Sequence, residues 1–223
     1  MAFGMEIRQA DGTLWMSPEV TPLNLIKKIS QTFTASYPFT ATTIATGVPS
    51  GNACMVFCKS TSGGGVAYTM DISGGYWVIT VRGCSTENGG SGGSVPITFY
   101  VFANMVTTPS RYSLAYYDAD GVMRWHAEMR PLEVLTQTPG GVPPRGKIEI
   151  GFNVAVCSVY SGTQMVLYQG GTPPLYTWMN FAYRAYGTNV VELPVAAWQE
   201  NSSSAYKSFI NGAIYYIKTD NYD

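Results

Sequence analysis

One stretch of sequence occurs twice and decides the fold. Residues 112–135 read YSLAYYDADGVMRWHAEMRPLEVL, and residues 3–26 read FGMEIRQADGTLWMSPEVTPLNLI, an ungapped match at an offset of 109. Apolar residues alternate before the shared Asp-Gly, at 3, 5 and 7 against 112, 114 and 116, and after it, at 14 and 16 against 123 and 125. Alternation of this kind is typical of a strand with one apolar face. Each copy therefore predicts a β-hairpin that turns at Asp-Gly.

The rest of the chain also reads as strands. β-Branched and aromatic runs bounded by Gly, Pro, Ser or Asn occupy 53–58, 76–81, 97–102, 147–156, 165–168, 178–186 and 212–217. Only 22–29, after Thr21 as a cap, has the features of a short helix. We therefore expect an all-β fold with little helix.

The repeat predicts two related β-sandwich-like domains. The first covers residues 1–110 and opens with the hairpin at 3–26; the second covers 111–223 and opens with the hairpin at 112–135. A merged sandwich, in which the two hairpins meet, is the alternative. The glycine-rich stretch 88–94 is expected to be a flexible hairpin tip, because apolar strands flank it closely.

Composition favours a protein that works by contact with other chains. Charged residues make up 12% and aromatic residues 13%, whereas charged residues in ordinary domains reach about 25%. Aromatic-rich surfaces with few charges are typical of interface centres. The net charge of −1, without a basic stripe, argues against a nucleic acid partner. The sequence has neither a signal-like start nor an apolar run of about 20 residues, so we expect synthesis in the cytoplasm and no membrane span.

No catalytic, cofactor or metal site is predicted. Cys54, Cys58, Cys84 and Cys157 are expected to be thiols in the core, and Cys54 and Cys58 should share one face of a strand. A disulfide or a metal site at these two cysteines is the alternative reading. The chain's one histidine, His126, aligns with Ser17 on the face opposite Trp125, so we expect it on the polar, solvent-facing side of its hairpin.

Paired carboxylates, which cleave sugars in glycosidases, have simpler explanations in this chain. Asp11 and Asp120 belong to the predicted turns, and Asp118 lies beside the second turn. The remaining acidic candidates belong to the repeat or to the end of the sequence: Glu19, Glu128, Asp220 and Asp223. Residues 218–223 are polar and are expected to trail along a neighbouring chain or to fray.

Tyrosines are the main candidates for contact residues. The largest group lies in the second half: Tyr112, Tyr116, Tyr117, Tyr183, Tyr186, Tyr206, Tyr215, Tyr216 and Tyr222. Tyrosine is both a strand former and a good contact residue. Tyr215 and Tyr216 are adjacent, so in a strand they must point to opposite faces, with one of them outward.

The hairpin at 3–15 resembles the "Gly-Leu-x-Val-x-Asn-x-x-Gly-x-x-x-Phe-Asp-Ser" start of small β-rich tail proteins from long-tailed bacteriophages. Residues 112–135 are similar to the same element, and they follow the strand 99–102, another feature of that family. Trp15-Met16-Ser17 and Arg124-Trp125-His126 stand where the family has Phe-Asp-Ser, and no functional residue carries over. The resemblance implies a tail-tip or baseplate component of the virion.

These observations together predict a non-enzymatic virion structural protein that binds other phage tail proteins, in several symmetric copies. A receptor- or carbohydrate-binding module of the tail is the alternative, in which outward aromatic rings stack on sugars of a host surface. A third reading, a cell-wall hydrolase, predicts peptidoglycan clearing that His126→Ala abolishes, and we expect no such activity.

Overall fold

The computed structural model describes residues 7–8, 12, 14–16, 21–110, 114–141, 146–158, 160–170, 174–201, 206–210 and 212–223. Regular structure in these ranges is almost entirely β, which confirms the all-β class. The one helical element among them is a short 3-10 turn, η1 (Thr219–Asn221). Within the same ranges, no helix has the length and apolar character that crossing a bilayer requires.

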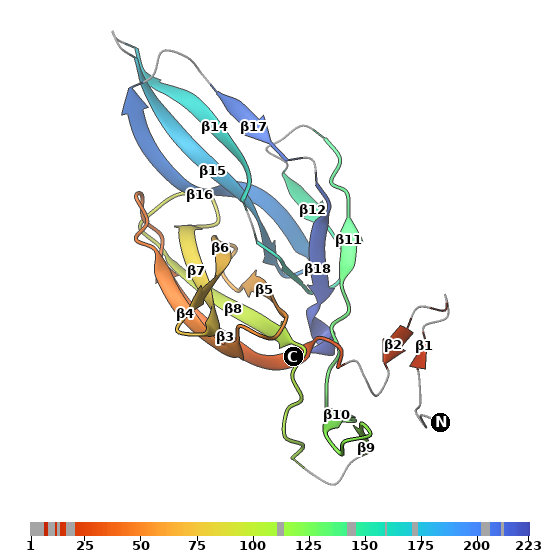
Figure 1. Ribbon diagram of the computed structural model, residues 1–223. Helices are drawn as coiled ribbons and strands as arrows, with labels where there is room; N and C mark the ends of the chain where they lie inside the picture. The colour runs from red at the N-terminus through yellow and green to blue at the C-terminus, as the bar shows by residue number, and fades with distance from the viewer. Residues whose placement is uncertain are drawn as a thin grey trace.

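The strands form two short hairpins and two larger sets, one set in each half of the chain (Figure 1). Two short hairpins are formed by β1 (Ile7–Arg8) with β2 (Leu14–Met16), and by β9 (Ala115–Tyr117) with β10 (Met123–His126). The first half contains β3 (Asn24–Thr34), β4 (Thr42–Pro49), β5 (Cys54–Ser60), β6 (Gly65–Ser73), β7 (Tyr76–Ser85) and β8 (Ser94–Ala103). The second half contains β11 (Leu135–Gln137), β12 (Lys147–Glu149), β13 (Val154–Val156), β14 (Tyr160–Gln169), β15 (Leu175–Tyr186), β16 (Asn189–Asn201), β17 (Lys207–Phe209) and β18 (Ile214–Lys218).

The first half is a sandwich of two three-stranded layers, one of which is part of an 11-stranded sheet that continues into the second half. β8 lies between β3 and β5 in one sheet, and β7 lies between β4 and β6 in the other. Alternate residues point between the sheets, so Val56 and Cys58 of β5 share one core with Tyr68 of β6 and Ile79 of β7. Phe99 of β8 packs edge-on against Tyr68, with ring centroids 5.8 Å apart.

The second half has the same strand connectivity, with two additions. β18 lies between β11 and β13, and β16 lies between β12 and β15, as β8 and β7 do in the first half. A smaller core that includes Val154, Tyr183, Val190 and Ile214 fills this sandwich. The additions, β14 and β17, continue the sheet beyond β15. Figure 1 shows β14, β15 and β16 extending together well past the sandwiches.

The two sandwiches join through β5 and β13, which gives the strand order β3-β8-β5-β13-β18-β11. Cys58 of β5 pairs with Val156 of β13. On its other side Cys58 pairs with Phe99 of β8, and on its other side Val156 pairs with Tyr216 of β18, so the two residues have neighbours from equivalent strands. The strand order is therefore the same from either edge. Hydrogen bonding thus crosses the boundary expected near residue 110, as in a merged sandwich, and the division into two domains stays a prediction.

Both repeated segments form hairpins in the same register. Ile7 pairs with Met16, and the residues equivalent to them at the offset of 109, Tyr116 and Trp125, pair in the second hairpin. The turn glycines both have positive φ, 85° at Gly12 and 75° at Gly121, which agrees with the Asp-Gly turns. The aligned residues at 3, 5, 10, 11, 19 and 112 lie outside the described residues.

The segments that follow the hairpins pair with each other. The Leu132 N–H donates to the Leu23 carbonyl at 2.7 Å, and the Leu25 N–H donates to the Arg130 carbonyl at 2.9 Å. Leu23 and Leu132 are equivalent in the repeat, so each lies against its own counterpart. Both leucines pack on the outer face of the joined sheet, where Phe57, Tyr100 and Phe102 are buried.

The end of the sequence is anchored in this outer cluster, and the expectation that residues 218–223 trail or fray is wrong. Tyr222 is 2% exposed, and its ring packs edge-on against Phe102 at 5.0 Å. The Tyr222 hydroxyl accepts from the Glu133 N–H at 2.8 Å and donates to the Pro131 carbonyl at 3.0 Å. The polar composition of residues 218–223 predicted a free tail, whereas the single aromatic ring of Tyr222 is enough to hold this segment in the cluster.

Three further expectations are corrected. Residues 22–29 do not form a helix, because β3 pairs along its length with β8, and this tertiary pairing overrides the local signal. The 147–156 run is two strands, β12 and β13, separated by Gly151 at a φ of 92°. The stretch 88–94 is not a hairpin tip, since β7 and β8, which flank it, belong to different sheets.

Side chains from both halves hold this glycine-rich connection. The Arg184 guanidinium of β15 donates to the Thr86 carbonyl at 2.8 Å and to the Glu87 carbonyl. Burial lowers the pKa of Arg184 to about 10. The Tyr37 hydroxyl donates to the Gly89 carbonyl at 2.6 Å. The connection is therefore fixed across the junction between the two sandwiches.

Candidate functional site

His126 is buried, at 1% exposure, so its expected solvent-facing position is wrong. Nε2 lies 2.8 Å from the Thr107 carbonyl oxygen and 3.0 Å from the Thr107 hydroxyl, while Nδ1 accepts from the Glu128 N–H at 3.3 Å. This network assigns the neutral tautomer with the proton on Nε2. The segment around Thr107, which lies outside the repeat, covers the polar face of the hairpin. The ring therefore ties this segment to the hairpin.

The carboxylates of Asp118 and Asp223 also have hydrogen-bond and ion-pair partners. Asp118 Oδ1 accepts from the N–H groups of Asp120 at 3.0 Å and Val122 at 2.8 Å, and Oδ2 pairs with Arg124 at 2.7 Å. The Val122 N–H, followed by Arg124, holds the pKa of Asp118 below its usual value. Asp223 pairs with Lys59 at 2.6 Å. Asp11 and Glu19 lie outside the described residues, and no group of three or more His, Cys, Asp or Glu gathers within them.

All four cysteines are free thiols. Cys58 is part of the first core and Cys54 packs against it, so the two cysteines share one face of β5 as expected. Burial raises the pKa of Cys54 to about 11 and of Cys84 to about 12, and it raises the pKa values of Cys58 and Cys157 as well. Thiols with raised pKa values stay protonated at neutral pH, and a protonated thiol is a poor nucleophile.

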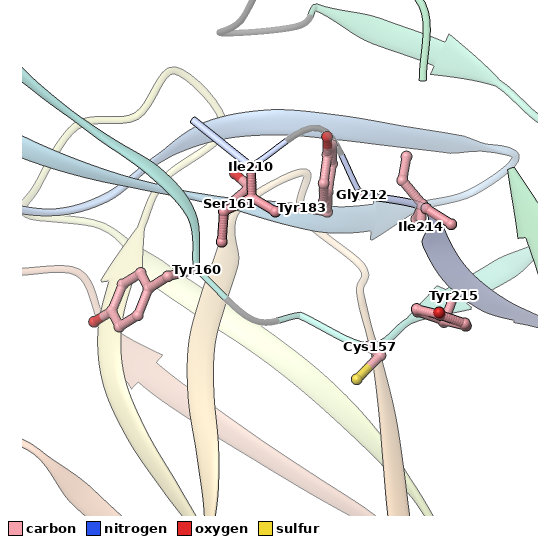
Figure 2. A pocket seen from close by; sticks show the side chains of 9 residues that line it. Cys157, Tyr160, Ser161, Tyr183, Ile210, Gly212, Ile214 and Tyr215 are labelled. Carbon is pink, nitrogen blue, oxygen red and sulfur yellow. The ribbon is translucent and has the colours of Figure 1, made fainter. Parts of the chain in front are cut away.

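Two cavities border the chain between β13 and β14. One, of about 120 Å³, is lined by Cys157, Tyr160, Ser161, Tyr183, Ile210, Gly212, Ala213, Ile214 and Tyr215. Figure 2 shows that these side chains come from β14, β15 and β18 and from the β13–β14 and β17–β18 connections. The other, of about 390 Å³, lies between β5 and β6 and is lined by Cys54, Met55, Val56, Tyr68, Thr69, Met70, Cys157 and Tyr160. Cys157 and Tyr160 therefore border both cavities.

A β-bulge directs Ser161 to the smaller cavity. Tyr160 pairs with Ala182 and Gly162 pairs with Phe181, so Ser161 is an extra residue in β14. A bulge of this kind re-aims one side chain out of the strand's alternation. Gly162 is required beside it, because a Cβ there would lie 2.3 Å from Cδ1 of Phe209 in β17. Glycine thus allows β17 to pack close to the bulge and close one wall of the cavity.

The walls of this cavity are apolar apart from a few hydroxyl groups. Ser161 is 4% exposed, and its Oγ has no hydrogen-bond partner among the residues that the structure describes. The nine described lining residues carry no formal charge. The arrangement can hold a small uncharged apolar group, and none of the described lining residues is a general base or a cationic group that would activate water or a nucleophile.

The sequence-based reasoning missed this cavity. The strand around β14 was expected only from residue 165, whereas β14 begins at Tyr160. The signal that could have found it is the glycine at 162 inside an extended segment, since such a glycine often marks a bulge or a close backbone approach.

Comparison of the chain with family models, with curated proteins and with solved structures gave no match.

Proposed function

We propose that this protein is a non-enzymatic structural component of a bacteriophage tail, at the tail tip or baseplate, and that it binds other tail proteins. The observation that carries the proposal is the apolar surface of the β9–β10 hairpin. Leu114, Tyr117 and Val122 are 68%, 53% and 50% exposed on this small element. Exposed apolar groups gathered on one element mark interaction sites in soluble proteins.

A second group of exposed apolar side chains lies on the extension formed by β14, β15 and β16. Val166 and Leu167 of β14 are 41% and 54% exposed, and Tyr206, just before β17, is 50% exposed. The Tyr206 ring lies 5.7 Å from that of Trp178 in β15. Both groups therefore lie on elements that project from the sandwiches (Figure 1). Projecting elements of this kind are suited to contact with neighbouring proteins.

The use of the polar side chains also favours a structural role. The His126 ring bonds to backbone groups through both nitrogens, and Asp118 fixes its own turn. These two candidates for acid or base chemistry, His126 and Asp118, thus form hydrogen bonds that stabilise the β9–β10 hairpin. Binding by such a protein would come from burial of apolar area, with aromatic anchors contributing most.

The test is crosslinking and mass spectrometry on intact particles of a phage that encodes this chain. We expect crosslinks from this chain to other tail proteins, and loss of incorporation when Leu114 and Tyr117 are both changed to serine. Ile72→Ser, at an equally exposed position on β6 outside both groups, is the control and should leave incorporation unchanged. Absence of the chain from purified particles would overturn the proposal.

A receptor- or carbohydrate-binding module is the second candidate. Outward tyrosines favour it, because aromatic faces stack on sugar rings: Tyr76, Tyr117, Tyr186, Tyr206 and Tyr215 are 43–53% exposed. Binding of the isolated protein to host envelope glycans, together with its absence from the inner tail assembly, would favour this candidate.

A further inference from the structure

The first sandwich is open on one side, between β5 and β6. β5 pairs with β13 only at Cys58, so residues 54–57 have no strand on the side away from β8 among the described residues. β6 is the last strand of its sheet in the same part of the chain. The cavity of about 390 Å³ lies between these two strands. Val56 and Tyr68 in its lining are buried and the other six lining residues are partly exposed, so the cavity is reached from solvent.

The edge of β6 presents free backbone groups beside this cavity. The Tyr68 N–H donates to the Ser158 carbonyl at 3.2 Å, away from β7. Backbone groups alternate in direction along a strand, so Met70 and Ile72 also turn their N–H and C=O groups away from β7. These groups have no partner among the described residues. Residues 68–73 contain neither lysine nor proline, which often protect an edge, so this edge can accept another strand.

The second half shows what such an edge can hold. β15 takes the place of β6 in the second sandwich, because β16 lies beside it as β7 lies beside β6. On its other edge β15 pairs with β14, and the pairing is antiparallel. No strand among the described residues takes the corresponding place beside β6. The relation between the halves therefore favours an antiparallel strand at this edge.

We propose that the free edge of β6 receives an extended segment of another tail protein. The segment pairs antiparallel with Met70 and Ile72, and its apolar side chains enter the cavity between β5 and β6. The inference rests on the proposed function, since it names the kind of segment through which a tail protein is held. Addition of a strand to an exposed edge is a common mode of peptide recognition.

The cavity and the outer face select the side chains of the segment. An engineered apolar cavity of about 150 Å³ holds one benzene, so a cavity of about 390 Å³ has room for about two large side chains. The lining residues carry no formal charge, which disfavours a charged side chain in the cavity. Asp71 and Ser73 alternate with the cavity-facing residues and make the outer face polar. The segment should therefore alternate apolar and polar residues.

A free segment suits this site better than a second copy of the chain. Every described strand of this chain already pairs within one of its own sheets. A second copy would therefore offer a sheet edge, and the core-facing side chains of such a strand fill their own sandwich. A segment without a sheet of its own can place its apolar side chains in the cavity.

The experiment uses the peptide acetyl-Thr-Ile-Thr-Ile-Lys-Ile-Thr-amide as the probe. Binding to the full chain is followed by NMR from the Met70 methyl group, with the Met129 methyl group as an internal control. N-methylation of two isoleucines removes donors that face β6 in antiparallel pairing, and it should weaken binding at least about tenfold. N-methylation of two threonines leaves these donors in place and should leave binding nearly unchanged. A peptide with serine at the three isoleucine positions should not bind.

Two variants of one residue separate the backbone from the side chain. Ile72→Pro removes an N–H that the β6–β7 pairing does not use, and proline is tolerated at such edge positions. It should weaken the peptide about five- to tenfold, the effect of one hydrogen bond. Ile72→Ser keeps the N–H and should change binding by about twofold or less. Thermal melting checks that both variants fold.

The outcomes distinguish this site from the proposed function. An unmoved Met70 methyl group, equal effects of the two N-methylated peptides, or parental binding by Ile72→Pro would overturn the strand site. In intact particles, a photoreactive p-benzoylphenylalanine at position 72 should crosslink to another tail protein; a crosslink to a second copy would overturn the partner. If the strand site fails while other crosslinks to tail proteins persist, the proposed function stands. Absence of the chain from particles refutes the function whatever the peptide does.

Discussion

Removing the hydroxyl of Tyr222 should destabilise the protein although the residue lies next to the end of the sequence. Tyr222→Phe deletes the group that accepts from the Glu133 N–H and donates to the Pro131 carbonyl. Two part-buried hydrogen bonds are then lost, and a typical intramolecular hydrogen bond contributes about 0.5–1.5 kcal/mol net. We expect a loss of about 2 kcal/mol in the free energy of unfolding.

Tyr222→Ala should cost more, because the ring itself is 2% exposed and packs against Phe102. Truncation of a large buried aromatic residue costs about 3–5 kcal/mol from lost transfer energy and the cavity left behind. For a chain of this size each kcal/mol lowers the melting temperature by about 2–4 °C. Tyr222→Phe should therefore melt roughly 4–8 °C below the parent, and Tyr222→Ala lower still.

The assay is thermal unfolding followed by circular dichroism, with amide hydrogen exchange at Glu133 as a local readout. Tyr215→Phe is the matched control: it removes the same hydroxyl from a tyrosine that is 49% exposed, and it should change stability by less than about 0.5 kcal/mol. A Tyr222→Phe protein that melts with the parent, with unchanged exchange at Glu133, would refute the anchoring of this end of the sequence.

Other perturbations test the hairpin, the bulge and the core. Gly162→Ala should cost about 1–3 kcal/mol in urea unfolding, since its Cβ would clash with Phe209, whereas Gly212→Ala, whose Cβ lies 3.6 Å from its nearest neighbour, should be neutral. Asp118→Ala should speed amide exchange in the β9–β10 turn, as its carboxylate accepts two backbone N–H groups there; unchanged exchange would count against this role. Alkaline pH should weaken the fold, because burial raises the pKa of Cys54 from 9.0 to about 11: its contribution is complete below pH 9 and is lost as pH rises toward 11. A denaturation midpoint that stays constant from pH 8 to 11 would contradict this last expectation.

The sequence predicted the strands well where pattern and packing agree. The runs at 53–58, 76–81 and 97–102 became β5, β7 and β8, because β-branched and aromatic residues fill a core on alternate positions. Tyr215 and Tyr216 point to opposite faces as expected, one exposed and the other buried. Period-two alternation carries this information without any knowledge of neighbouring strands.

Expectations failed where a distant segment decides the environment. His126 was assigned to solvent from its place on a hairpin, but the segment at Thr107 covers that face. The apparent helix at 22–29 is a strand because β8 pairs with it. Ser161 escaped notice because a bulge is defined by the register of two strands, and a single sequence does not contain that register. A local sequence pattern does not predict contacts between segments that lie far apart along the chain.

The joint between the halves has the geometry of an isologous contact. Cys58 lies against Val156, and Leu23 lies against Leu132, so matching positions meet each other. A contact of this type closes on itself, whereas head-to-tail contacts between unlike surfaces propagate into filaments. The backbone groups through which β5 and β13 pair bond to each other within one molecule, so they cannot pair with a second copy. Any growth of an assembly must therefore begin elsewhere, for example at edge strands such as β3, β4, β6, β11 and β12, or on the projecting elements.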